Sequence, residues 1–268
     1  DYVGGYVELS ENKPVNIKVA SSFISIEQAE LNLQQELGKA KSLEAVKEAA
    51  LNAWEAQLGK IEVEGGTKSQ KETFYSCLFR AMLFPRKFYE LDVNGNPTYY
   101  SPYDGKVHKG LMFTDTGFWD TFRAQFPLNI ILHPQMHEQY IQSLLDAYDQ
   151  SGWLPSWSFP GHNGGMIGNH AFSLQADAYV KGLTRFDTKK ALDAMYHDAN
   201  HKAPFGASIG RPAAADYFKL GYVPHDRTRR AGREATAKTL EFAYNDFCAM
   251  VLAQGTGDKE KADFFGKS

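Results

Sequence analysis

The spacing of apolar and polar positions changes near residue 28. Over residues 6–9 and again over 15–19 the two kinds of side chain alternate, which is typical of half-buried β-strands. The segment 11–14, which ends in a proline, separates them as a turn. Because two strands alone are not stable in water, we expect residues 1–28 to be the final β-hairpin of a β-domain that lies upstream.

From Ile26 onward the apolar residues recur at the spacing of amphipathic helices. One or two linker helices are predicted within residues 29–60. The segment 67–70 has the capping-box pattern, Thr followed three positions later by Gln, which begins a helix that must end before Pro85. Further helices are predicted at 117–131, 134–150, 169–183, 187–200 and 235–254, and another begins near 258.

The expected caps support these helices. Pro134 fits a first helical turn, Asn169 and Asp187 fit N-caps, and Gly255 fits the end of the last long helix. No confident strand separates the helices, so stacked antiparallel helices are favoured over an α/β sheet. The fold class predicted from these patterns is therefore mainly α.

Two long connections, residues 86–116 and 152–168, are rich in Tyr, Trp, Gly, Pro, His and Asn. A plain helical bundle needs only short links, so long loops on a helical scaffold point to function. Helix, long loop and helix recur loosely along the chain, as a barrel of concentric helices requires.

Composition excludes several functional classes. The chain has 268 residues, 43% of them apolar, and a net charge of −3 with both signs interleaved, so nucleic acid is not an expected partner. No apolar run approaches the ~20 residues that a membrane-spanning helix requires. Cys77 and Cys248 each lie in an apolar helical pattern and are expected to be buried structural residues.

The loop before residue 170 combines aromatic rings with small polar groups. Sugars offer C–H faces that pack on aromatic rings and hydroxyl groups that need donors and acceptors. A surface loop whose tryptophans fill the core explains the same composition equally well. The candidate sugar-binding residues in this segment are Trp157, His162, Asn163, Asn169 and His170.

A second candidate lies at Trp119 and Asp120, where an aromatic ring, a carboxylate and the guanidinium of Arg123 fall within one helical turn. Asp120 could bind a sugar diol, and this is favoured over an ion pair with Arg123 three positions later because Trp119 lies beside it. Lys238 and Glu241, also three apart, are expected to pair on a solvated face.

Neither catalytic nor metal-binding residues can be assigned from spacing. Asp226, Glu234 and Asp246 are carboxylates of the kind that glycoside hydrolysis uses in pairs, but structural roles are favoured for all three. His133 and His137 have the spacing of a helical metal pair, yet Pro134 forces His133 out of the helix and the glutamate of a zinc-protease motif is missing.

Seven motifs occur in an order that resembles glycoside hydrolase family 92, the calcium-dependent exo-acting α-mannosidases. The resemblance covers essentially the whole chain, and seven ordered motifs are far more specific than one. They are IEVEGGT (61–67), GFWDTFRA (117–124), GWLP (152–155), MIGNH (166–170), DAYVKG (177–182), GYVP (221–224) and TLEFAYND (239–246).

The resemblance implies an N-terminal β-sandwich ending at residue 28, linker helices over 29–60 and the first part of an (α/α)6 toroid over 61–268. It also implies a secreted or periplasmic bacterial enzyme that removes terminal α-linked mannose from glycans with inversion, with α-1,2 linkages expected. Calcium is the implied cofactor, a hard cation with oxygen ligands, and its ligands are expected mostly beyond residue 268.

Within the implied site, Asp120 matches a carboxylate expected to contact the terminal mannose, and Trp119 lies beside it. Residues 161–170 match a loop at the rim of the pocket, but His162, Asn163 and Gly164 replace the Glu or Cys that many relatives carry, which leaves linkage preference open. The general-acid motif Glu-Gly-Asn and the later base motif do not occur, so this piece is expected to need the C-terminal part of the same protein for activity.

Two other interpretations stay open at this level. The chain could be a non-catalytic carbohydrate-binding module, or belong to another (α/α)6 enzyme such as a glucoamylase-like hydrolase or a polysaccharide lyase, since this fold hosts many chemistries.

Overall fold

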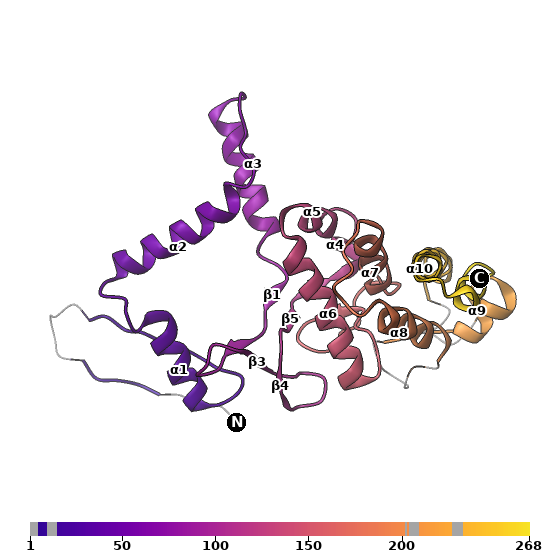
Figure 1. The fold of residues 1–268 in the computed structure, drawn as a ribbon, viewed down its shortest axis with the longest axis horizontal. Coiled ribbons are helices and arrows are strands. Elements are labelled where there is room, and N and C mark those ends of the chain that lie inside the picture. The colour runs from indigo at the N-terminus through magenta and orange to yellow at the C-terminus, as the bar shows by residue number, and fades with distance from the viewer. Residues whose placement is uncertain (1–4, 10–14, 202, 204–208, 227–232) are drawn as a thin grey trace.

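The computed structural model describes residues 5–9, 15–201, 203, 209–226 and 233–268. They form a mainly α-helical chain in which the helices after residue 117 stack side by side as part of a toroid (Figure 1). Among the described residues, no helix has the length and apolar character that crossing a membrane would demand. The turn predicted at residues 11–14 lies outside the described residues.

The predicted hairpin strands are absent from residues 5–9 and 15–20, the described part of this segment. The side chains of Val7, Ile17 and Val19 are 82%, 73% and 77% exposed. An alternating pattern produces a strand only when one face is covered and the backbone groups find a ladder partner. In the described chain no sheet pairs with these segments, so the strand prediction is wrong here.

Three helices precede the packed body, and each begins at a side-chain cap. They are α1 (Ile26–Leu37), α2 (Leu43–Leu58) and α3 (Lys68–Ala81), with N-caps Ser25, Ser42 and Thr67. The predicted capping box is confirmed, because the side chains of Thr67 and Gln70 each accept a hydrogen bond from the other residue's backbone. All residues of α1 and α2 are described and none is buried, as expected for helices that extend away from the body (Figure 1).

Short strands, which the hydrophobic pattern did not predict, organise the long connections. Each is two to four residues long, too short to show a period of two. β1 (Arg86–Lys87) pairs with β5 (Phe113–Thr114), β2 (Glu90–Leu91), β3 (Pro97–Tyr100) and β4 (Val107–Lys109) form a meander, and β6 (Thr116–Gly117) pairs with β7 (Trp157–Ser158).

The helix predicted over 117–131 is divided into α4 (Phe118–Thr121) and α5 (Gln125–Leu132). Pro127 explains the break. Proline has no N–H and its ring clashes with the carbonyl four residues earlier, so a continuous helix through residue 123 is excluded. Proline is tolerated in a first turn, where α5 places it.

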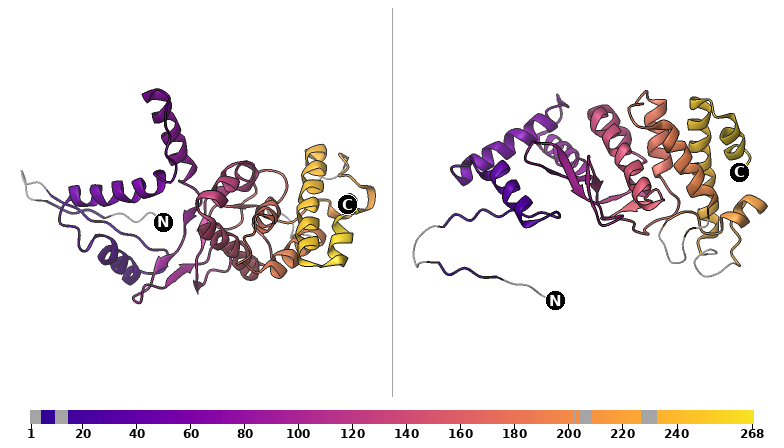
Figure 2. Two further views of the ribbon diagram at one scale, coloured as in Figure 1. Left: turned by 45° about the horizontal axis from the view of Figure 1, so that its top comes forward. Right: turned by 60° about the horizontal axis from the view of Figure 1, so that its bottom comes forward.

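The remaining helices build the core. α6 (Pro134–Ser151), α7 (Ala171–Val180), α8 (Thr188–Asn200), α10 (Ala235–Thr256) and α11 (Lys259–Phe265) pack side by side, with α10 against α7, α8 and α11 (Figure 2). Their facing sides bury Ile141, Leu145, Met195, Ala249 and Leu252 at 0% exposure. This apolar core is the scaffold from which the long connections 86–116 and 152–168 extend.

Several boundaries differ from the sequence expectations. α7 begins at Ala171, and Asn169 still acts near its start, since Asn169 Oδ1 accepts a hydrogen bond from the Ala171 N–H. α10 continues through Gly255 to end before Gly257. The short helix α9 (Ala214–Leu220) was not expected. Cys248 is buried as expected, but Cys77 is exposed because α3 leaves the packed body.

Candidate functional site

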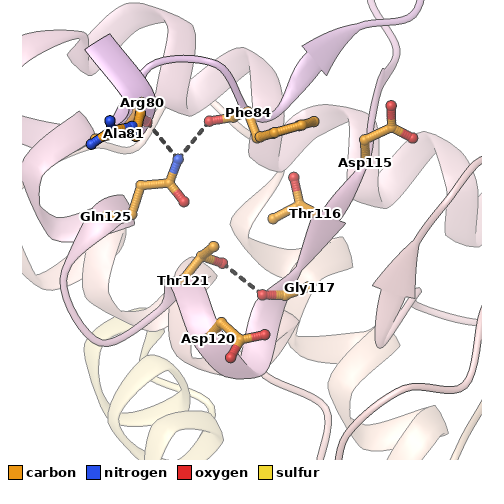
Figure 3. Close-up of a pocket in the computed structure, with 9 residues that line it drawn as sticks. All are labelled: Arg80, Ala81, Phe84, Asp115, Thr116, Gly117, Asp120, Thr121 and Gln125. Atoms are coloured by element: carbon orange, nitrogen blue, oxygen red, sulfur yellow. Dashed lines mark hydrogen bonds between the residues drawn. The ribbon is translucent and has the colours of Figure 1, made fainter. Parts of the chain in front are cut away.

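Asp120 lies on the exposed side of α4 and lines a pocket of about 390 Å³ (Figure 3). Thr121 Oγ1 donates a hydrogen bond of 3.0 Å to Gly117 O, which ties the short helix to strand β6. On the opposite wall, Gln125 Nε2 donates to Ala81 O and Phe84 O, both at 2.6 Å. The pocket lining is Arg80, Ala81, Phe84, Asp115, Thr116, Gly117, Asp120, Thr121 and Gln125.

Trp119 joins α4 to α10, 122 positions later in the chain. Its indole Nε1 donates a hydrogen bond of 3.1 Å to Glu241 Oε1. Arg123 lies over the Trp119 ring at 4.6 Å from the ring centroid, and its guanidinium is 3.7 Å from the same Glu241 oxygen. The ion partner of Arg123 is therefore Glu241, and the alternative of an Asp120–Arg123 pair is not formed.

The expected Lys238–Glu241 pair is not formed either. Lys238 is buried and its Nζ donates to Arg233 O. The helix turns Glu241 toward α4 and α7 because Phe242, the next residue, fills the core at 2% exposure. Glu241 was thus missed as a site residue, although it lies in a motif, TLEFAYND, that the family resemblance uses.

His170 completes this cluster from the N-terminal end of α7. Its Nε2 lies 3.0 Å from Glu241 Oε2, and its ring stacks on Phe122 with centroids 4.1 Å apart and planes 4° apart. Burial, reinforced by the positive charge of Arg123, lowers the pKa of His170 to about 4. The imidazole is therefore neutral at pH 7 and can present one acceptor nitrogen to a ligand or a neighbour.

Asn169 is buried and hydrogen-bonded to two other helices, and its role in sugar binding stays a prediction. Its Nδ2 donates to Asp198 Oδ2 at 3.2 Å, and its backbone N–H donates to Asn245 Oδ1 at 2.9 Å. Asp198 also accepts a hydrogen bond of 3.2 Å from the Leu154 N–H. Both ends of the aromatic loop are therefore held by one carboxylate on α8.

Trp157 packs between the backbones of two glycines. A Cβ atom added at Gly117 would lie 2.6 Å from the Trp157 ring, and one added at Gly165 would lie 1.7 Å from it. The ring is partly buried. Two glycine backbones therefore lie close to the Trp157 ring, and the role of Trp157 in sugar binding stays a prediction.

The other two loop candidates differ in accessibility. His162 Nε2 lies 2.8 Å from Ser151 Oγ, its ring meets Tyr103 edge-on, and burial lowers the pKa of His162 to about 4. Asn163 is exposed, and its backbone N–H donates to Trp157 O at 3.0 Å. Within this loop, Asn163 is therefore the candidate whose side chain faces solvent, whereas His162 fastens the loop to the end of α6.

The other carboxylates considered from the sequence, Asp226, Glu234 and Asp246, lie in three different environments. Asp246 forms a buried ion pair with Arg211, Asp226 is exposed, and Glu234 stands at the N-cap of α10 with φ +57°. Across the described ranges, no three His, Cys, Asp or Glu side chains gather as a metal site. His133 Nδ1 lies 2.9 Å from Lys60 Nζ, and the ring of His137 meets Phe126 edge-on.

Comparison with known proteins agrees with the fold and the motifs. The family model described as the glycosyl hydrolase family 92 catalytic domain matches residues 28–268. A curated relative from the fungus Arthroderma benhamiae, named an uncharacterized secreted glycosidase, is 29% identical over 278 residues, covering 99% of this chain and 31% of the relative.

Two solved structures from Bacteroides thetaiotaomicron are also similar. One, a family 92 inverting mannosidase, is 49% identical with a TM-score of 0.87, over 91% of this chain and 32% of that protein. The other, a family 92 α-mannosidase, is 30% identical with a TM-score of 0.79, over 91% of this chain and 31% of that protein. This chain thus spans about a third of the length of these relatives, and it belongs to glycoside hydrolase family 92.

Proposed function

We propose that this chain is part of an inverting α-mannosidase that removes terminal α-linked mannose from glycans, with α-1,2 linkages preferred. The observation that carries the proposal is the match of the family 92 catalytic domain over residues 28–268. The solved structure that is 49% identical is named an inverting mannosidase. The part assigned to this chain is recognition of the sugar, and the whole activity belongs to the longer protein.

The pocket beside Asp120 has the properties that sugar recognition requires. Its volume of about 390 Å³ lies in the range of small-molecule sites, about 300–1,000 Å³. The exposed carboxylate of Asp120 can accept hydrogen bonds from two neighbouring hydroxyl groups, and Thr121 and Gln125 add neutral polar groups nearby. Trp119, on the same turn of helix, lies outside the pocket lining; Arg123 covers its ring and its indole donates to Glu241.

Inversion requires two further carboxyl groups, an acid for the leaving oxygen and a base for water, about 6.5–9.5 Å apart. Asp246 is held in a buried ion pair with Arg211, and the Glu-Gly-Asn motif expected to carry the acid does not occur in residues 1–268. We assign the acid and the base to parts of the protein outside this chain.

Calcium dependence is part of the same proposal. The described residues do not fit a complete calcium site, because no three His, Cys, Asp or Glu side chains gather among them, whereas calcium takes six to eight oxygen ligands. We therefore assign the ligands to the rest of the protein and derive no step through the ion.

A secreted or periplasmic location is also proposed, supported by the name of the fungal relative.

The test is release of mannose from α-1,2-, α-1,3- and α-1,6-mannobiose, with calcium and with a chelator. It compares this chain with a full-length family 92 protein that contains it. We expect activity in the full-length protein, highest on the α-1,2 disaccharide and abolished by the chelator, and none in the isolated chain. Absence of mannose release from all three disaccharides by the full-length protein would reject the function.

A matched pair of variants assigns the sugar contact to this chain. Asp120→Asn keeps the shape of the side chain and removes its charge, and we expect kcat/KM to fall at least about tenfold because a charged hydrogen-bond acceptor is lost. Asp263→Asn, an exposed carboxylate on α11 away from the pocket lining, is the control and should change kcat/KM less than about twofold.

A further inference from the structure

We propose that Glu241 is a positioning residue of the sugar site: it holds the indole of Trp119 by a hydrogen bond and lies against the imidazole of His170. The inference rests on the proposed function, because it concerns the same site. Glu241 itself lies on α10, outside the pocket lining, and it acts through the residues it contacts.

The two carboxylate oxygens of Glu241 face two different elements. Oε1 accepts the hydrogen bond of 3.1 Å from Trp119 Nε1 on α4, and Oε2 lies 3.0 Å from His170 Nε2 at the start of α7. One side chain on α10 therefore sets the distance between the helix that carries Asp120 and the end of the aromatic loop. A hydrogen bond to a charged acceptor is about twice as strong as one between neutral groups.

The backbone is built to allow this approach. Gly168 has φ +79°, and a Cβ there would lie 3.1 Å from the Cβ of Glu241 and 3.2 Å from both Asn245 Oδ1 and His170 Nε2. A glycine at this position lets the loop end lie directly against α10. Asn245, one turn after Glu241, accepts a hydrogen bond from the Asn169 N–H. Glu241 and Asn245 therefore both contact the end of the loop.

The charge of Glu241 is balanced locally. Its side chain is 19% exposed, and the guanidinium of Arg123 lies 3.7 Å from Oε1. Arg123 also covers the rings of Trp119 and Phe122, both at 4.6 Å. The carboxylate therefore has a positive partner and some contact with water, and both stabilise it as the acceptor that holds the indole.

Helix α4 depends on such contacts for its placement. It has four residues, and its N-cap Gly117 provides no side-chain hydrogen bond. A helix this short is not stable by itself, so its tertiary contacts decide how it lies. Because Trp119 precedes Asp120 directly, a change in the Trp119–Glu241 contact should displace the carboxylate that lines the pocket.

The first test is a spectroscopic one on this chain, with the Trp119 indole Nε1–H resonance assigned from Trp119→Phe. Glu241→Leu should shift that resonance, and Glu241→Gln, which keeps an acceptor oxygen, should shift it much less. An unchanged resonance in Glu241→Leu overturns the proposal. Should Glu241→Leu lose the circular dichroism of the folded chain, Glu241→Asp, which withdraws the carboxylate by one methylene, replaces it with the same expectation.

The second test is a double-mutant cycle in the full-length protein on α-1,2-mannobiose. Glu241→Leu should lower kcat/KM at least about tenfold, and Glu241→Gln less than about threefold. In the Trp119→Phe background the effect of Glu241→Leu should shrink to less than about threefold. An equal effect in both backgrounds overturns the positioning role. If the unaltered full-length protein releases no mannose, the proposed function fails, and the indole resonance still decides the role of Glu241.

Discussion

The carboxylate of Asp198 accepts a hydrogen bond of 3.2 Å from the side-chain amide of Asn169, 29 positions earlier in the chain. The same oxygen accepts the Leu154 N–H, and Asp198 is 1% exposed. Burial raises the pKa of Asp198 to about 6. A single buried group thus closes the loop between residues 154 and 169.

Removal of the Asp198 carboxyl group should lower the free energy of unfolding more than removal of its charge alone. Asp198→Ala removes the acceptor of the buried Leu154 N–H and leaves Asn169 Nδ2 only its hydrogen bond of 3.4 Å to Leu154 O. We therefore expect the free energy of unfolding to fall by about 2 kcal/mol or more. Asp198→Asn can keep one oxygen in place for both donors and should cost less than about 1 kcal/mol. Urea unfolding followed by circular dichroism measures both, and equal losses in the two variants would contradict this account.

Stability should decrease as the pH falls from about 6.5 toward 5. Burial lowers the pKa of His137, His162 and His170 to about 4 each, so in this range the unfolded chain, with ordinary histidines near 6.5, binds more protons than the folded chain. Asp198 acts in the opposite sense, because its raised pKa of about 6 lets the folded state take up the proton first. The combined effect of the three histidines on the free energy of unfolding is larger than the opposite effect of Asp198.

Urea unfolding at pH 7, 6 and 5 tests this expectation. His162→Gln, which keeps a polar group near Ser151, should weaken the dependence on pH, and Asp198→Asn should steepen it. Stability that stays constant or rises between pH 7 and 5 would show that these histidines are not buried as described.

Local sequence signals predicted the helices well where caps and periodicity coincide. The capping box at Thr67 and the cap at Asp187 give helix starts that the structure confirms. Proline at 134 likewise marks the first residue of α6. Such signals depend on neighbours within one turn, so they need no knowledge of the tertiary fold.

The site was predicted in part, because its contacts join distant segments. Asp120 could be proposed from its motif, and the structure places it at a pocket. Glu241 could not be linked to Trp119, since 122 positions separate them and sequence spacing informs only about neighbours on one helix. Composition left sugar binding and core filling equally open for Trp157, because only the fold places the backbones of Gly117 and Gly165 close to its ring.

The Arg211–Asp246 ion pair should matter for stability and not for chemistry. Both side chains are buried, at 3% and 1% exposure, and Arg211 lies over the rings of Phe172, Tyr217 and Phe242. Asp246→Leu leaves the guanidinium unpaired, so we expect a loss of about 3–5 kcal/mol in the free energy of unfolding.

The double variant Arg211→Met with Asp246→Leu is the control for that pair. Because it removes both charges and keeps apolar volume, it should recover much of the loss. If the double variant is as unstable as the single one in urea unfolding, the ion pair is not the reason for the loss.

Replacement of Gly165 by alanine should displace Trp157. The added Cβ would lie 1.7 Å from the ring, and a ring between two backbones cannot move aside without opening the loop. Overpacking of this kind costs about 1–3 kcal/mol. Urea unfolding should show that loss, and tryptophan fluorescence should change in the same variant.

Two controls separate contact with the Trp157 ring from a general effect of removing a glycine. Gly5→Ala, where nothing lies within 4 Å of the new Cβ, should alter neither measurement. In the Trp157→Ala background the added methyl group meets no ring, so Gly165→Ala should then cost less than about 0.5 kcal/mol. A full loss in that background would place the strain elsewhere in the loop.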